Sequence, residues 1–143
     1  MGCIWSNNTA NVRAFLDSAW NGSISEVKQY LDAGVHVNSK NSEGQTALIW
    51  ASGEGHMEVC ELLVTRGCYL NMQNKDGNTA FMRASYSGHI PIVIFLIEAG
   101  CDCSLRNNAG KSGMDILRRD HPDKVKKVQV SRSLTAVVTD SLI

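Results

Sequence analysis

Two of the five cysteines in this chain of 143 residues stand close together, as Cys101-Asp102-Cys103. Cysteine thiolates bind zinc, but structural zinc sites use a second pair of ligands, and none follows here. His56 and His89 each follow a glycine, and no serine, cysteine or lysine lies at a spacing that would pair a nucleophile with its base. We therefore expect no catalytic residue, no metal and no cofactor, and we interpret the cysteines as small buried side chains.

The first six residues, Met1-Gly2-Cys3-Ile4-Trp5-Ser6, fit the template for N-terminal myristoylation. Removal of Met1 exposes the unhindered amine of Gly2, and Ser6 occupies the last position of the template. One myristoyl chain binds a membrane only marginally, with a constant of about 10⁴ M⁻¹, so a second signal is needed. No lysine or arginine precedes Arg13, so that signal would be a palmitoyl group on Cys3.

This leader resembles that of the doubly acylated Src-type kinases, which implies attachment to the cytoplasmic face of a membrane. The alternative is an ordinary leader with an unmodified cysteine. At the other end, Ser141 and the last residue, Ile143, resemble the C-terminal ligands of PDZ domains. We keep this tail as a second candidate motif.

A repeat with a constant period organises the middle of the chain. Among the recurring positions are glycines that are expected to end helices and a threonine that is expected to begin one. The following pairs of positions align: Gly44 with Gly77, Thr46 with Thr79, Ala47 with Ala80, Ala51 with Ala84, Gly55 with Gly88, His56 with His89, Leu63 with Leu96, Gly67 with Gly100, and Cys68 with Cys101.

Each period predicts two short helices and a turn. Thr46 and Thr79 are expected to cap an inner helix, which Gly55 and Gly88 end. The outer helix begins after the histidine, and Lys75-Asp76-Gly77 predicts a tight hairpin between units. One such unit cannot bury its apolar face alone, so at least three must stack.

This pattern resembles the ankyrin repeat family, whose period is about 33 residues, from about residue 11 to about residue 128. The resemblance implies an all-α solenoid of about four helix-turn-helix units linked by β-hairpin turns. We expect a leader at 1–8 and a repeat domain at 9–130, followed by a flexible tail at 131–143. Within the domain, the predicted boundaries are an N-cap repeat at 9–40, full repeats at 41–73 and 74–106, and a C-cap repeat at 107–130.

Two departures from the family pattern suggest looser packing between the units. The usual Thr-Pro-Leu-His is Thr46-Ala47-Leu48-Ile49 in one repeat and Thr79-Ala80-Phe81-Met82 in the next. Both therefore lack the proline that favours a helix start and the histidine that links loops in the family.

Composition excludes several classes of protein. Lys plus Arg is 14 and Asp plus Glu is 14, and this zero net charge argues against bulk binding of nucleic acid. No apolar run is long enough to predict a transmembrane helix, and residues 1–20 lack the features of a secretory signal. We interpret the cysteines as reduced thiols in a cytoplasmic setting.

The function expected from this interpretation is that of a non-catalytic adaptor, monomeric and tethered to a membrane by acylation of Gly2 and Cys3. A soluble inhibitor or regulatory subunit that masks a partner's site is the alternative. In either case the concave groove and the hairpin tips would contact an unknown protein, because aromatic and loop residues dominate such contacts. The candidate contact residues are Trp20, Asn21, Glu43, Gln45, Gly53, Glu54, Asp76, Asn78, Tyr86, Ser87 and Lys111.

Overall fold

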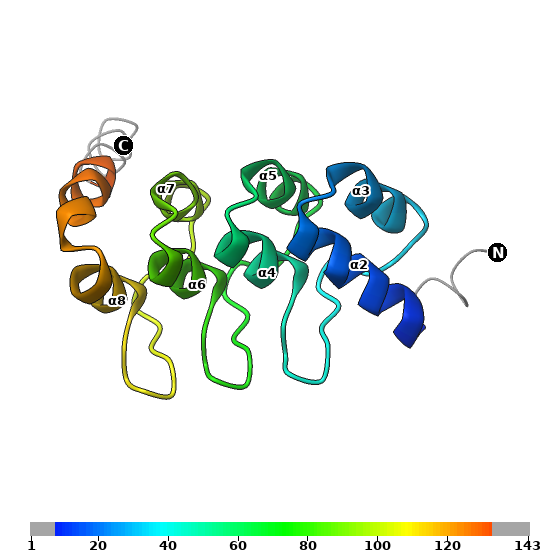
Figure 1. The fold of residues 1–143 in the computed structure, drawn as a ribbon, viewed down its shortest axis with the longest axis horizontal. Helices are drawn as coiled ribbons and strands as arrows, with labels where there is room; N and C mark the ends of the chain where they lie inside the picture. Colours follow the sequence, from blue (N-terminus) through cyan, green and yellow to red (C-terminus); the bar gives the residue numbers. More distant parts are fainter. Residues whose placement is uncertain (1–7, 133–143) are drawn as a thin grey trace, which may run out of the picture.

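The computed structural model describes residues 8–132, which form a row of helix pairs with three hairpins projecting to one side (Figure 1). The inner helices, next to the hairpins, are α2 (Thr9–Asn21), α4 (Ala47–Glu54), α6 (Ala80–Ser87) and α8 (Gly113–Asp120). The outer helices are α3 (Ile24–Asp32), α5 (Met57–Thr65) and α7 (Ile90–Glu98), and the last pair is completed by the 3-10 turn η1 (Pro122–Lys124) and helical residues 125–132. The predicted all-α solenoid is confirmed.

The core runs along the row as one continuous layer between inner and outer helices. Each inner helix packs against the next, and each outer helix packs against its own inner helix. A single unit would leave these apolar faces in water, so the stacking of neighbours provides the burial. The largest fully buried side chains are Phe15, Phe81, Ile49, Leu63, Met82, Leu96, Ile116, Leu117, Val27, Val59, Val93 and Val128.

The inner helices begin and end as their sequences predict. The hydroxyl oxygens of Thr46 and Thr79 accept hydrogen bonds from the third backbone N–H of α4 and α6, at 3.2 Å in both cases. Gly55 and Gly88 end these helices with φ of 87° and 73°, a left-handed conformation that glycine adopts without steric cost.

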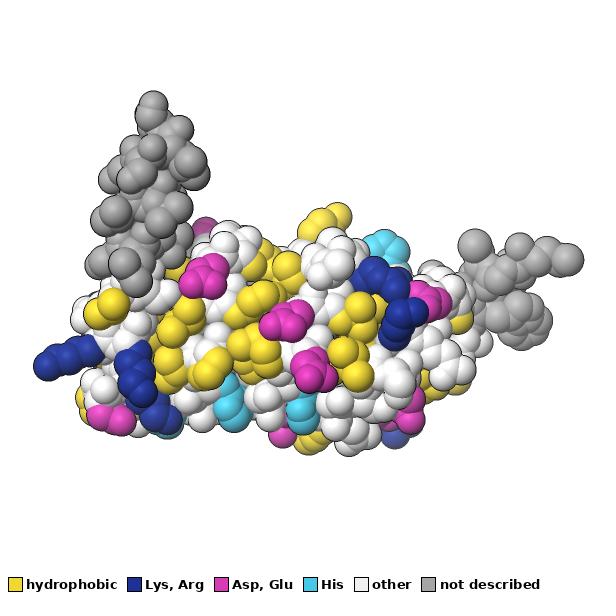
Figure 2. Space-filling model, turned by 90° about the horizontal axis from the view of Figure 1, so that it is seen from above, with side chains coloured by type: hydrophobic (Ala, Val, Ile, Leu, Met, Phe, Trp, Pro, Cys, Tyr) yellow, Lys and Arg dark blue, Asp and Glu magenta, His cyan; other side chains and the backbone are white. Residues whose placement is uncertain are grey.

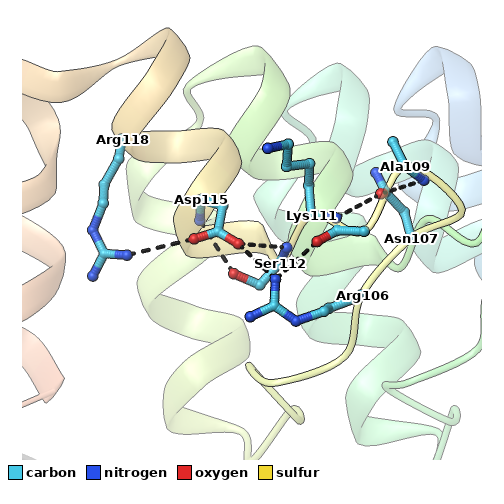
Figure 3. A network of polar contacts seen from close by, with 8 residues as sticks. Arg106, Asn107, Ala109, Lys111, Ser112, Asp115 and Arg118 are labelled. Carbon is cyan, nitrogen blue, oxygen red and sulfur yellow. Dashed lines mark hydrogen bonds and ion pairs between the residues drawn. The ribbon is translucent and has the colours of Figure 1, made fainter.

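Helix α8 begins with a fuller cap (Figure 3). The Ser112 hydroxyl accepts from the N–H of Asp115 at 3.2 Å, and the Asp115 carboxylate accepts from the N–H of Ser112 at 3.1 Å. Arg106 and Arg118 pair with the same carboxylate at 3.0 and 3.6 Å. The hydrogen bonds with Ser112, and then the charge of Arg106, lower the pKa of Asp115. The hairpin before α8 is therefore bonded to the helix that follows it.

One asparagine sets the conformation of each hairpin. The side-chain oxygens of Asn41, Asn74 and Asn107 each accept bonds from the backbone N–H groups two and four residues later, at 2.9 to 3.0 Å. A side-chain amide in this position replaces the partners that a wider sheet would supply. Within residues 8–132 the hairpins contain no extended strand, only an isolated bridge between Lys40 and Thr46.

The same asparagines join successive hairpins. Asn74 Nδ2 donates to Gln45 Oε1 at 3.2 Å, and Asn107 Nδ2 donates to Asn78 Oδ1 at 3.0 Å. Backbone bonds run in parallel, from the N–H of Lys75 to a carbonyl of the first hairpin at 3.0 Å and from that of Asn108 to the second at 2.9 Å. The hairpins are thus held in register with one another.

Histidines link the units at the other end of the inner helices. His56 Nε2 bonds to the carbonyl of Trp20 at 2.7 Å, and His121 Nε2 bonds to the carbonyl of Tyr86 at 3.0 Å. A carbonyl can only accept, so each Nε2 donates. The units are therefore linked at these two joints, although the motif histidine is missing from both full repeats.

The face made by the outer helices mixes apolar side chains with charged and polar ones (Figure 2). Figure 2 shows this face from above, with hydrophobic side chains gathered between acidic ones. On α7, Ile94, Phe95 and Ile97 are half-buried. No helix within residues 8–132 combines the length and hydropathy needed to cross a membrane.

The hairpin asparagines lead to a stability prediction. Asn107→Ala removes the acceptor for two backbone N–H groups and a buried donor to Asn78, so we expect a loss of about 2–4 kcal/mol at about 1 kcal/mol per bond. Chemical denaturation followed by circular dichroism measures the loss. The neighbouring Asn108→Ala removes one exposed side-chain bond, to the carbonyl of Lys75, and serves as the control. Equal losses for the two variants would contradict the role given to Asn107.

Candidate partner-binding site

A cavity of about 580 Å³ lies at the N-terminal end of the row, between α2, the first hairpin and α4. This volume lies within the range of roughly 300–1,000 Å³ that is usual for ligand sites. Helix α2 supplies one wall with Thr9, Val12, Arg13, Leu16, Asp17 and Trp20; the hairpin supplies Lys40, Asn41 and Ser42, and α4 supplies Trp50.

Two tryptophans stack at the inner end of this cavity. The ring centroids of Trp20 and Trp50 are 4.2 Å apart, and their planes are tilted by 42°. Such a pair stabilises its own geometry by about 0.5–1.5 kcal/mol. Trp20 remains 45 % exposed while Trp50 is half-buried, so the pair presents an aromatic surface to solvent. The bond from His56 to the Trp20 carbonyl fixes the backbone beneath it.

Charged side chains flank the aromatic pair. Arg13 and Asp17 come from exposed positions of α2, and Lys40 comes from the hairpin. None of the three forms an ion pair within residues 8–132. Their charges are therefore available to a molecule that enters the cavity.

Gly53 does not take part in this surface, contrary to the sequence prediction. It is buried, and a Cβ atom placed there would lie 3.3 Å from Arg83 Nε, which is close. The missing side chain leaves room for Arg83 of the next unit. Arg83 Nε is itself buried without a hydrogen-bond partner in the described part of the chain.

Tyr86 shares the register of Trp20 but serves the neighbouring unit. Its hydroxyl oxygen accepts from Asn107 Nδ2 at 3.2 Å, and the Arg119 guanidinium lies 5.8 Å from its ring centroid. The half-buried ring is thus tied to the last hairpin and to α8. The ring therefore has contacts within the framework, which the sequence pattern did not indicate, and the contact of Tyr86 with a partner stays a prediction.

The remaining candidate residues divide into two groups. Gln45 and Asn78 belong to the bonds between hairpins, and Asn78 is buried, so neither offers a free tip. Six others have exposed positions at hairpin tips or at the ends of inner helices: Asn21, Glu43, Glu54, Asp76, Ser87 and Lys111. These six lie in reach of a partner along the row, but they do not line the cavity.

Four predicted positions lie outside the described residues. They are the acylation residues Gly2 and Cys3 and the C-terminal motif residues Ser141 and Ile143. Within residues 8–132, no group of three or more histidine, cysteine, aspartate or glutamate side chains could hold a metal ion.

The geometry of repeated helix pairs and hairpins agrees with a family comparison. A model of three consecutive ankyrin repeats matches residues 15–107, more than half of the chain. The chain belongs to the ankyrin repeat family. Ankyrin repeats point to a role in binding other proteins.

Three curated plant proteins share shorter stretches with this ankyrin chain. Acyl-CoA-binding domain-containing protein 4 of Oryza sativa subsp. japonica is 46 % identical over 46 residues, which is 32 % of this chain and 14 % of that protein. Acyl-CoA-binding domain-containing proteins 1 and 2 of Arabidopsis thaliana are 36 % and 32 % identical over 59 residues, 41 % of this chain. The matches span only 18 % and 17 % of those proteins.

Sequence reasoning missed most of the cavity lining. Trp50 follows Asp17 by one repeat period, and both positions face the same groove. An extension of the register argument from position 20 to position 17 would have found both residues. The contribution of Lys40 and Ser42 had no such signal, because it depends on the path of the first hairpin.

The bond of Tyr86 to the last hairpin can be tested by removal of one atom. Tyr86→Phe deletes the acceptor for Asn107 Nδ2 but retains the ring, so we expect a loss of about 0.5–1.5 kcal/mol in the free energy of unfolding. Urea titration gives the value. Tyr30→Phe, at a half-buried tyrosine of α3, is the control and should be close to neutral. An unchanged stability for Tyr86→Phe would show that the hydroxyl carries no structural bond.

Proposed function

We propose that this ankyrin chain is a non-catalytic adaptor that binds a protein partner at the cavity between α2, the first hairpin and α4. The observation that carries the proposal is the exposed tryptophan pair, flanked by charges of both signs that form no ion pair within residues 8–132. Tryptophan and arginine are enriched among residues that dominate binding energy.

The cavity favours a partner segment with an apolar side chain beside polar or charged groups. The faces of Trp20 and Trp50 accept an aliphatic or aromatic side chain. Arg13 and Lys40 supply two positive charges, and Asp17 supplies one negative charge. Opposed charges at a rim fix the orientation of a bound segment more than they add affinity.

The acyl-CoA binding that the names of the plant relatives indicate is not part of the function proposed for this chain. Those proteins carry acyl-CoA-binding domains by name, but the matched stretches of 46 and 59 residues equal about one to two ankyrin units. The repeat architecture alone accounts for a similarity of that length. We therefore infer from these relatives only that the chain shares their repeats, and we do not infer that it binds acyl-CoA.

Attachment to a membrane is the second part of the proposal. It takes Met1 as the initiator, Gly2 as the myristoylated residue and Cys3 as the palmitoylated one. Two acyl chains are needed for stable anchoring, since one alone binds reversibly. The adaptor would then present its cavity to partners at the cytoplasmic face.

The role of the cavity is tested by comparative affinity purification with three full-length proteins: wild type, Trp20→Ala and Tyr69→Ala. Tyr69 is 67 % exposed but does not line the cavity, so it is a matched aromatic control. We expect a partner that wild type and Tyr69→Ala retain and that Trp20→Ala loses, with binding weakened by about 2 kcal/mol or more once the partner is purified. Unchanged circular dichroism of Trp20→Ala shows that the fold is intact. A partner retained equally by all three proteins would place the contact elsewhere.

The membrane anchor is tested by fractionation of a eukaryotic cell that expresses the chain. Gly2→Ala should move the protein to the soluble fraction, because both acyl chains depend on the first. Cys3→Ser should weaken retention and leave the myristoyl group in place. An intact mass that shows an unmodified Gly2 in the wild-type protein would refute this part of the proposal.

A further inference from the structure

The thiols of Cys101 and Cys103 face each other at the end of α7. Their sulfur atoms are 3.9 Å apart, and both side chains are partly exposed. Thiols that lie next to each other and open to solvent are the arrangement found at redox-active sites. Two such thiols can form a disulfide bond, or they can serve only as packing side chains. The groups around them distinguish the two roles.

The loop that carries the two thiols is held in place. The N–H of Asp102 donates to Asn71 Oδ1 of the preceding unit at 2.8 Å, and the Asp102 carboxylate accepts from the N–H of Ser104 at 2.9 Å. These bonds hold the backbone of the residue between the cysteines, and in this conformation of the loop the two sulfur atoms lie 3.9 Å apart.

The preceding unit provides an internal comparison. Cys68 occupies the same register position as Cys101, but Leu70 stands where Cys103 would be. Burial, together with the nearby Cys60, raises the pKa of the Cys68 thiol to about 11. In the preceding unit a cysteine and a leucine therefore fill the two positions, so packing does not require a second thiol. Only the unit of Cys101 and Cys103 has a thiol at both positions.

The groups around the pair favour a thiolate rather than a bound cation. The hydrogen bond with Cys101 lowers the pKa of Cys103 to about 7, opposed by burial and by Asp102 and assisted by the positive charge of Arg132. The same bond raises the pKa of Cys101, and burial raises it further. A neighbouring arginine disfavours a metal ion, whereas it stabilises the anionic nucleophile of disulfide exchange.

We propose that Cys101 and Cys103 form a reversible dithiol–disulfide site that reacts with small disulfides such as oxidised glutathione. The Cys103 thiolate attacks one sulfur of oxidised glutathione, forms a mixed disulfide and releases one glutathione thiolate. The Cys101 thiol then loses its proton to water, and its sulfur attacks the Cys103 sulfur and releases the second glutathione. The chain loses two electrons and two protons, and oxidised glutathione becomes two reduced molecules.

The closure requires only a short movement. The sulfur atoms must approach from 3.9 Å to the bonded distance of about 2.05 Å. Asp102 and Ser104 are exposed, so the loop has no packed side chain on its outer side to oppose the adjustment. Cys60, in contrast, is fully buried with its pKa raised to about 11, and it has no access to the oxidant.

Peptide mapping tests the site in the full-length chain. Trypsin places Cys60, Cys68 and the Cys101–Cys103 pair in separate peptides, residues 41–66, 67–75 and 84–106. After treatment with oxidised glutathione and alkylation with N-ethylmaleimide, we expect peptide 84–106 without alkyl groups and lighter by two hydrogens. Dithiothreitol should restore both thiols. Cys68 should remain alkylated as a free thiol.

Variants separate the two steps. Cys101→Ser should leave glutathione attached to Cys103, because the second attack is lost. Cys103→Ser should react at least about tenfold more slowly, because the remaining thiol is mostly protonated. Wild-type protein that accumulates the mixed disulfide, forms dimers linked through these cysteines, or shows Cys103 no more reactive than Cys68 would overturn the proposal.

The pH profile provides an independent measurement. A thiol whose pKa is lowered to about 7 is half ionised at about that pH, so the alkylation rate of Cys103 should rise through pH 7 and then level off. The rate for Cys68 should still be rising well above this range. Cys101→Ala removes the hydrogen bond between the two thiols and should shift the Cys103 profile upward. A profile that does not move would show that the two thiols are not coupled.

Discussion

The bifurcated acceptance of two backbone N–H groups by one asparagine oxygen is the interaction on which the array depends. Asn41, Asn74 and Asn107 each make it at the turn of a hairpin. The hairpins are too short to be stable by themselves, since an isolated two-stranded ribbon is marginal in water. The same amide then donates to the preceding unit from the second and third hairpins, so local conformation and stacking are set by one side chain. Once the hairpins are in register, the inner helices meet at a fixed spacing and the core closes.

The tryptophan cavity lies where the regular repeats pack against the irregular first unit. Helix α2 is longer than the other inner helices, with 13 residues against 8 in α4. Its N-terminal part lies beside the first hairpin (Figure 1), and the cavity is between the two. Trp20 and Trp50 converge there because they come from adjacent inner helices, in register positions three residues apart, which lie on one face of a helix. In the rest of the groove, side chains make contacts between the repeats. Arg83 packs over Gly53, and Tyr86 is bonded to Asn107.

The sequence predicted the features that depend on local chemistry and a fixed period. The threonine caps, the helix-ending glycines and the histidine turns of the two full repeats all lie where the repeat period places them. Contacts between units were harder to predict. Gly53 was assigned to the groove by register, but the space it leaves is taken by a long side chain from the next repeat. Tyr86 bonds to a partner in the next hairpin, and a periodicity argument contains no information on such a bond. The sulfur contact of Cys101 and Cys103 likewise depends on the side-chain directions in a turn.

The joints between units are not equally bonded, and this has a mechanical consequence. Polar bonds join the third and fourth units at the hairpins, at Tyr86 and at Lys124. No hairpin precedes α2 within residues 8–132, so the joint of the first unit lacks the asparagine ladder. It depends on the helices, on His56, on the Asp32–Arg66 pair and on the bond from the Tyr69 N–H to Asn38 Oδ1. Loads on a linear array pass through every joint in series, and the least connected joint yields first. The tryptophan cavity spans this joint. A molecule bound there would act as a clamp across this joint, so occupancy of the site and resistance of the array to being pulled apart would rise together.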